Sequence, residues 1–149
     1  MNKIILSFAA GLTLLFTADL SAQCKAKPIV KICMPMLGDF MYDSYVVKEI
    51  EYGPKAKKET LDFEVFSDEQ YKLVFGQTAL PHEVGITIYG MEKGKKKIIY
   101  FDESGKKTVQ DFSFSATKTG PYFIEFEIPA ATAPGQKGCF ILLIGIKDM

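Results

Sequence analysis

The chain of 149 residues contains no tryptophan, no arginine and a single histidine, His82. A general nucleic-acid-binding protein needs a surplus of basic residues to displace counterions from phosphates, but here 18 lysines are balanced by 18 Asp and Glu. The absence of tryptophan also lowers the expectation of a sugar-binding face, because such faces stack sugars on exposed rings. The hydrophobic content of 48% argues against an intrinsically disordered chain.

Recognisable catalytic patterns are missing as well. We interpret His82, in a turn between two expected strands, as a solvated residue rather than a base. No G-x-S-x-G motif, glycine-rich phosphate loop or C-x-x-C pair occurs. The carboxylate pairs Asp62/Glu64 and Glu125/Glu127 each lie two residues apart on a strand, where their charges are expected to face solvent. We therefore expect no enzymatic activity, no cofactor and no metal site.

Residues 1–22 are expected to form a signal peptide. Lys3 supplies the positive start, Ile4 to Phe16 is almost entirely apolar, and Leu20-Ser21-Ala22 permits cleavage after Ala22. The apolar run of about 13 residues is shorter than the roughly 20 that a membrane-spanning helix requires, although an uncleaved anchor is the alternative. We expect a protein exported to the periplasm or the medium, without a transmembrane helix in the mature chain. Residues 23–149 would form one β-sandwich domain.

All three cysteines would remain after cleavage and enter an oxidising compartment. An odd number permits one disulfide and one free thiol. We predict a bond between Cys33 and Cys139, which would join the first and last strands, with a Cys24–Cys33 bond as the alternative. A lipid on Cys24 is a less favoured alternative, because an acylated cysteine normally follows Gly, Ala or Ser and here follows Gln23.

Short alternating segments separated by turn residues run through the mature chain. Apolar and charged residues alternate at Leu61–Val65 and Tyr122–Ile128, the period of a half-buried strand. Cys139–Ile146 is nearly all apolar, as expected of a central strand covered on both faces. Ile29–Met34 is a candidate for a further strand, and no segment shows sustained helical periodicity. Other strands are expected at residues 44–52, 71–75, 84–89, 97–101 and 109–115. The sequence predicts an all-β fold, a single antiparallel, jelly-roll-like β-sandwich of eight or nine strands.

The order of three segments, Thr60–Phe75, Ile86–Tyr89 and Gly120–Phe126, resembles the small jelly-roll modules of exported bacterial proteins, including the bacterial pre-peptidase C-terminal domains. The last expected strand, Gly138–Gly145, also resembles that of uncharacterised exported proteins of the Bacteroidota. The resemblance covers roughly Leu61 to Lys147. It implies a β-sandwich with an accessory role and transfers no catalytic residue.

The remaining aromatic residues offer a candidate ligand platform. Tyr42, Tyr45 and Tyr52 lie among polar residues and are the best candidates for exposed rings. We expect a non-enzymatic accessory module of the cell envelope that recognises an envelope or secreted protein by its loops or a sheet edge. The alternative is a carbohydrate-binding module that uses the three tyrosines to bind a polysaccharide.

Three further features have both a functional and a structural interpretation. Lysine clusters at residues 55–58, 93–97 and 106–107 would suit an anionic partner, but we expect them to be solvated loops beside hydrophobic strands. The apolar residues within Met34–Met41 either fill the core or dock another protein, and we expect them in the core. Oxygen-rich turns leave calcium binding open, although no complete calcium-loop signature accompanies them: Asp39 with Asp43, Ser67–Glu69 and Asp102–Ser104.

Overall fold

The structure, a computed structural model, describes residues 24–102, 109–131, 133 and 135–148. The expected signal peptide lies outside the described residues. Within them, a short helix and a 3-10 turn precede eight strands. Their bounds are α1 (Ala26–Cys33), η1 (Met34–Leu37), β1 (Met41–Glu51), β2 (Lys57–Val65), β3 (Glu69–Ala79), β4 (Gly85–Glu92), β5 (Lys95–Asp102), β6 (Val109–Ser115), β7 (Gly120–Ile128) and β8 (Lys137–Asp148). In this part of the chain, no helix has the length and apolar character needed to cross a membrane.

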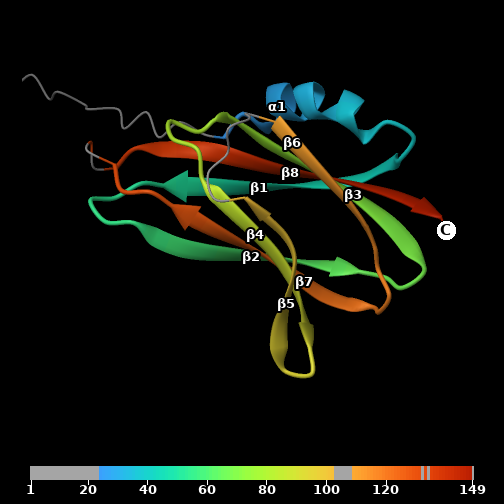
Figure 1. Cartoon of the computed structure of the whole chain (residues 1–149). Coiled ribbons are helices and arrows are strands. Elements are labelled where there is room, and N and C mark those ends of the chain that lie inside the picture. The colour runs from blue at the N-terminus through green and yellow to red at the C-terminus, as the bar shows by residue number, and fades with distance from the viewer. Residues whose placement is uncertain (1–23, 103–108, 132, 134, 149) are drawn as a thin grey trace, which may run out of the picture.

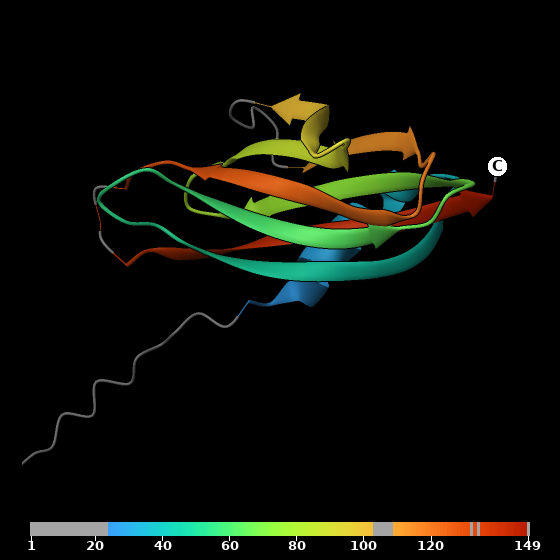
Figure 2. The same cartoon turned by 90° about the horizontal axis from the view of Figure 1, so that it is seen from below.

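The strands form two antiparallel sheets that face each other (Figures 1 and 2). Sheet A has the order β1-β8-β3-β6, and sheet B has the order β2-β7-β4-β5. Strands pair from the two ends of the chain inward, β1 with β8, β2 with β7, β3 with β6 and β4 with β5. This is the order produced when one long two-stranded ribbon is rolled into a jelly roll. The predicted all-β, jelly-roll-like sandwich is confirmed.

The main core fills the space between the sheets. In β7, Ile124, Phe126 and Ile128 are buried between the sheets, whereas Glu125 and Glu127 face outward, as the alternation predicts. The ring of Phe126 packs edge-on against that of Phe140 in β8, with centroids 4.7 Å apart. β8 lies between β1 and β3 and is buried on both faces. The prediction of a doubly covered central strand at Cys139–Ile146 is therefore confirmed.

Helix α1 covers part of the outer face of sheet A (Figure 2). Its buried residues Ile29 and Cys33 lie over Gly76 of β3, where an added Cβ would be 2.6 Å from Ile29 Cγ2 and 2.9 Å from Cys33 Sγ. The prediction of a strand at Ile29–Met34 is wrong. Its β-branched residues favour a strand, but the buried positions recur at the four-residue spacing of a helix that packs one side on a sheet.

The apolar residues that follow the helix are divided between the interior and the surface. Leu37 is buried, and Met36 and Phe40 pack against the same cluster beneath α1, as expected. Met34 and Met41 are exposed instead. This segment therefore continues the cover of sheet A rather than entering the main core.

The disulfide joins Cys24 to Cys139, whose Cα atoms are 5.5 Å apart. The predicted Cys33–Cys139 bond and the alternative Cys24–Cys33 bond are both wrong, because the helix turns Cys33 onto β3 as a buried free thiol. Burial raises the pKa of the Cys33 thiol, which favours its less reactive protonated form. The bond also occupies the sulfur of Cys24 that an acyl chain would need, so the structure contradicts the lipid alternative.

Candidate functional site

Tyr52 is not a surface platform. Its side chain is only 1% exposed, and its hydroxyl donates a hydrogen bond to the carbonyl oxygen of His82. Its ring also packs edge-on against the His82 ring. The Nε2 atom of His82 lies 3.2 Å from Gln136 Oε1. Burial raises the pKa of Tyr52. The prediction of an exposed ring at Tyr52 is wrong, because this residue joins the end of β1 to the β3–β4 connection.

Tyr42 and Tyr45 are exposed and lie on the same face of β1. Tyr42 is opposite Gly145 and Tyr45 is opposite Leu143, with a bulge between Tyr42 and Ser44. Side chains three residues apart normally point to opposite faces of a strand, but the extra residue of a bulge restores the phase. Val47, opposite Ile141, is on this face too and is 39% exposed. Tyr42, Tyr45 and Val47 form an exposed surface on the outer face of sheet A, which we call the β1 stripe.

The backbone at the stripe is open on one side. Among the described strands, only β8 pairs with β1. The Tyr52 N–H donates to the Gln136 carbonyl oxygen over 2.8 Å at the end of this pair. Since hydrogen-bonded and non-hydrogen-bonded pairs alternate in antiparallel sheets, the N–H and C=O groups of Tyr45 and Val47 point away from β8. Exposed apolar side chains and outward-pointing backbone groups therefore belong to the same residues.

The other three edge strands carry features that discourage pairing with another chain. β5 begins with three lysines, and β6 is the shortest described strand, with seven residues. The outward side chains of β2 are all polar or charged: Lys58, Thr60, Asp62 and Glu64. Among the described side chains, β1 carries three exposed apolar residues on its outer face, whereas β5 carries one, Ile98.

Ion pairs close the side of the sandwich where β1 faces β2. Lys48 of β1 lies 2.7 Å from Glu59 of β2, which is also 2.7 Å from Lys57. Hydrogen bonds from Lys48 and then Lys57 lower the pKa of Glu59. These contacts hold the Lys48 ammonium against β2, so its charge is neutralised at the edge.

The carboxylates and lysines considered as catalytic or anion-binding groups mostly pair with each other. Glu125 lies 2.9 Å from Lys96 and 3.1 Å from Lys58, which is also 2.7 Å from Glu127. Lys97 lies 3.0 Å from Glu92. This arrangement supports the interpretation of a solvated outer face on sheet B.

The oxygen-rich turns are engaged in local contacts. Asp39 forms an ion pair with Lys147, and Glu69 accepts a hydrogen bond of 2.6 Å from the Tyr71 hydroxyl. Within the described residues, no three His, Cys, Asp or Glu side chains are grouped as metal ligands would be. The turn beginning at Asp102 continues into residues 103 and 104, which are outside the described ranges.

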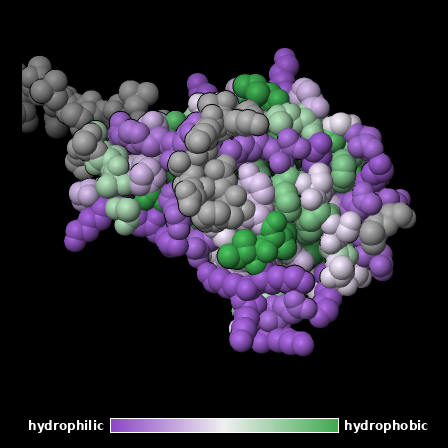
Figure 3. All heavy atoms as spheres, in the orientation of Figure 1, coloured by the Kyte–Doolittle hydropathy of each residue, from purple (hydrophilic) through white to green (hydrophobic). Residues whose placement is uncertain are grey.

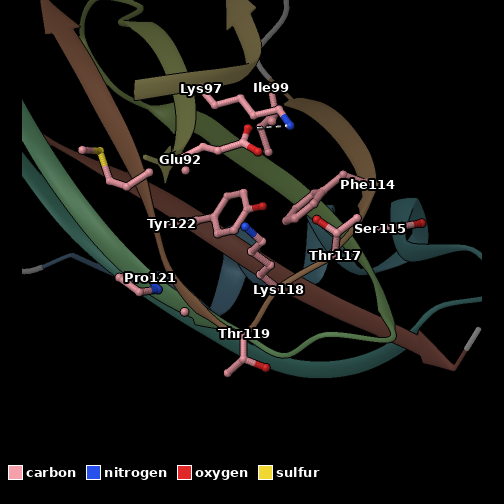
Figure 4. Close-up of a pocket in the computed structure, with 13 residues that line it drawn as sticks. Glu92, Lys97, Ile99, Phe114, Ser115, Thr117, Lys118, Thr119, Pro121 and Tyr122 are labelled. Carbon is pink, nitrogen blue, oxygen red and sulfur yellow. Dashed lines mark ion pairs between the residues drawn. The ribbon is translucent and has the colours of Figure 1, made fainter. Parts of the chain in front are cut away.

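A cleft of about 280 Å³ opens on the far side of the sandwich, between the β4–β5 hairpin and the β6–β7 loop (Figure 4). The rings of Phe114 and Tyr122 line it with centroids 5.3 Å apart, and Ile99 lies beside them. Tyr100 is opposite Ile88 whereas Ile98 is opposite Tyr89, so Ile99 is an extra residue in β5. Such a bulge bends its strand. The hairpin indeed extends away from the sandwich in Figure 1, and its hydrophilic tip lies below more apolar atoms in Figure 3.

Charged groups surround this apolar floor. The Lys97–Glu92 ion pair lies on one side and Lys118 projects from the loop on the other (Figure 4). The pKa of Glu92 is lowered mainly by its hydrogen bond with Lys97, and the charge of Lys118 also lowers it. Sequence reasoning missed the cleft because its residues come from β4, β5, β6, β7 and a loop, and none of these segments contains a motif.

Comparison with known proteins finds no matching family model and no similar curated protein. The structure is distantly similar to Aeromonas hydrophila PliG, a periplasmic lysozyme inhibitor of g-type lysozyme, with 14% identity and a TM-score of 0.46 over 72% of this chain and 88% of that one. It is also similar to a protein from Sulfurospirillum deleyianum, with 12% identity and a TM-score of 0.42 over 72% of this chain and 99% of that one. Neither likeness identifies a family for this chain.

Proposed function

We propose that this protein is an exported, non-enzymatic binding module of the bacterial cell envelope that recognises a protein partner at the edge of sheet A. The Cys24–Cys139 disulfide supports export, because such bonds persist mainly in oxidising compartments. The observation that carries the partner proposal is the β1 stripe. There, Tyr45 and Val47 combine exposed apolar side chains with backbone groups that point away from β8.

The partner segment would be an extended strand that adds to β1. Backbone hydrogen bonds would supply affinity, and alternate side chains packed on the stripe would supply specificity. The bulge beside Asp43 limits regular pairing at one end, so the pairing window runs from Ser44 to Glu51. Within this window the partner would place apolar side chains beside Tyr45 and Val47.

Photocrosslinking in the native envelope tests this proposal. A photoreactive amino acid at position 47 should give one discrete crosslinked polypeptide that is not a second copy of this chain. The same group at Ile98, which is 59% exposed in edge strand β5 of the other sheet, is the matched control and should not give that product. Absence of the product at position 47, or equal crosslinking from both positions, would contradict the proposal.

The backbone contribution can be tested separately. Val47→Pro removes an N–H that faces away from β8, and proline is tolerated at such positions in edge strands. Val47→Ala removes the same side-chain contacts but keeps the N–H. Partner recovery should therefore be lower for Val47→Pro than for Val47→Ala, and equal recovery would exclude strand addition at this residue.

The two co-facial tyrosines favour a second candidate function, binding of a polysaccharide by ring stacking. Tyr42→Ala and Tyr45→Ala would then abolish retention on an envelope polysaccharide column. Val47→Pro, which keeps both rings, would leave it unchanged. The opposite pattern would favour the protein partner.

A further inference from the structure

The cleft on the β5–β6 side is separate from the β1 stripe, because β1 and β2 form one lateral side of the sandwich and β6 and β5 form the other. It combines an aromatic floor with charged groups at its mouth. Tyr122 has a defined place there, since an added Cβ on Gly90 would be 3.1 Å from Tyr122 Cζ. The absence of a side chain on Gly90 therefore allows the tyrosine ring to lie across β4 and form the floor with Phe114.

The charge at the mouth is unbalanced. Lys97 and Lys118 contribute two positive charges and Glu92 contributes one negative charge, which leaves one net positive charge among the cleft-lining residues. Both lysines act on the same carboxylate, because each lowers the pKa of Glu92. Since Lys97 is paired with Glu92 over 3.0 Å, Lys118 is the cation at the mouth for which the described residues provide no ion-pair partner. A ligand with one negative charge would complete this arrangement.

We infer that the cleft binds a small organic acid in which one carboxylate is attached to an aromatic or branched aliphatic body. The body would pack on Phe114, Tyr122 and Ile99, and the carboxylate would accept hydrogen bonds from Lys118. A volume of about 280 Å³ is near the lower limit of ligand pockets, which fits a single ring and its substituent. This site does not depend on the protein partner proposed at β1.

Titration of the mature, disulfide-bonded protein with 3-phenylpropanoate, followed by amide NMR, tests the inference. Resonances of Gly90, Thr119 and Gly120 should shift in a saturable manner, and those of Val47 and Thr60 should not. The uncharged analogue 3-phenylpropanamide is the ligand control and should bind about tenfold more weakly or worse, because it lacks the charge-assisted contact.

Two lysine variants identify the cation. Lys118→Gln should weaken binding of the acid about tenfold and leave binding of the amide unchanged. Lys95→Gln removes an exposed lysine of the same hairpin that does not line the cleft, and it should leave the affinity for the acid within about twofold.

Several results would overturn the inference. No saturable shift at the solubility limit of the acid would exclude the site, and equal binding of acid and amide would exclude the role of charge. Equal weakening by Lys118→Gln and Lys95→Gln would indicate general attraction to a basic hairpin. Binding of a peptide that ends in a free phenylalanine carboxylate, without binding of the small acid, would assign the cleft to a polypeptide terminus instead.

Discussion

The outer faces of the two sheets differ in what covers them. On sheet A, Val74, Ile141 and Leu143 are buried beneath α1 and η1. On sheet B, Glu125 and its two lysine partners lie on an outer face that no described helix covers (Figure 2). The central strands of the two sheets differ accordingly. β8 is apolar at successive positions, whereas apolar and charged residues alternate in β7. The periodicity of a strand thus indicates how many of its faces are covered.

The β1 stripe is the part of the apolar outer face of sheet A that the helix leaves uncovered. Tyr45 is opposite Leu143 and Val47 is opposite Ile141, and both residues of β8 are buried under the cover. The apolar surface therefore continues from β8 to β1, although the helix packs mainly over β3 and β8. The outward positions of edge strand β2 are polar or charged, whereas the corresponding outward positions of β1 at Tyr45 and Val47 are apolar.

The largest expected effect comes from removing the covalent attachment of the cover. Replacing Cys24 and Cys139 together by serine opens a loop with a sequence separation of 115 residues. In the chain-entropy model this should lower the free energy of unfolding by about 4–5 kcal/mol, measured by chemical denaturation. Hydrogen exchange should accelerate most in α1 and on the outer face of sheet A.

Reductant provides the matched experiment. It should destabilise the natural chain and leave the double serine variant unaffected, because that variant has no disulfide to break. If reductant and the double substitution both leave stability unchanged, the covalent bond contributes nothing to the cover of sheet A.

A smaller effect is expected where the helix meets β3. The Cβ of Gly76→Ala would be 2.6 Å from Ile29 Cγ2, so the helix must shift at a cost of about 1–3 kcal/mol, measured by chemical denaturation. Gly53→Ala is the control, since nothing lies within 4 Å of its added Cβ. Equal stabilities of the two variants would mean that α1 does not pack closely on sheet A.

The fold was predictable because the pattern of apolar residues along a strand depends on how many of its faces are buried. A strand buried on one face alternates, and a strand buried on both faces is apolar throughout. The alternation at Tyr122–Ile128 and the apolar run at Cys139–Ile146 both gave the correct environment. Helix α1 was not predictable in this way. Its eight residues include Ile29 and Val30, whose β propensity favours a strand. Only two of its positions, Ile29 and Cys33, are buried, which is too few to show a helical period in the sequence. The wrong disulfide followed from that error, because a strand and a helix place Cys33 differently.

The candidate sites were predictable only in part. Tyr42 and Tyr45 were identified from their polar surroundings, but nothing local shows the bulge that brings their rings to one face. Tyr52 has similar neighbours in sequence and is buried by a contact with His82, which is 30 residues away. The cleft depends on the contact between Tyr122 of β7 and Phe114 of β6. The periodicity of a single segment cannot predict which residues of two strands pack together.

On sheet B the expected effect is smaller still. Glu125→Gln removes the anion shared by Lys96 and Lys58, and the loss of stability at neutral pH should be about 1 kcal/mol or less because the lysines are exposed. Hydrogen bonds from Lys96 and then Lys58 lower the pKa of Glu125 in the folded protein. Its stabilising contribution is therefore fully present above the unfolded-state pKa of about 4.3 and is lost as the pH falls through the lower folded-state value.

Denaturation curves of the natural chain and Glu125→Gln at several pH values check this sign. The difference between them should be greatest at neutral pH, should decrease in acid and should also decrease in high salt, because salt screens exposed charges. A difference that grew on acidification would contradict the role of the Glu125 carboxylate.

The smallest effect on stability is expected at the stripe, and it distinguishes a recognition surface from part of the cover. Val47→Lys replaces a side chain that is 39% exposed, so the free energy of unfolding should change by no more than about 0.5 kcal/mol, measured by chemical denaturation. Thr60→Lys, on the outer face of edge strand β2 in sheet B, is the matched control and should change the free energy of unfolding by a similar amount. A loss above about 1 kcal/mol for Val47→Lys alone would mean that Val47 belongs to the packing beneath α1. A neutral result would mean that folding does not require an apolar residue at this position, as expected of a surface used for recognition.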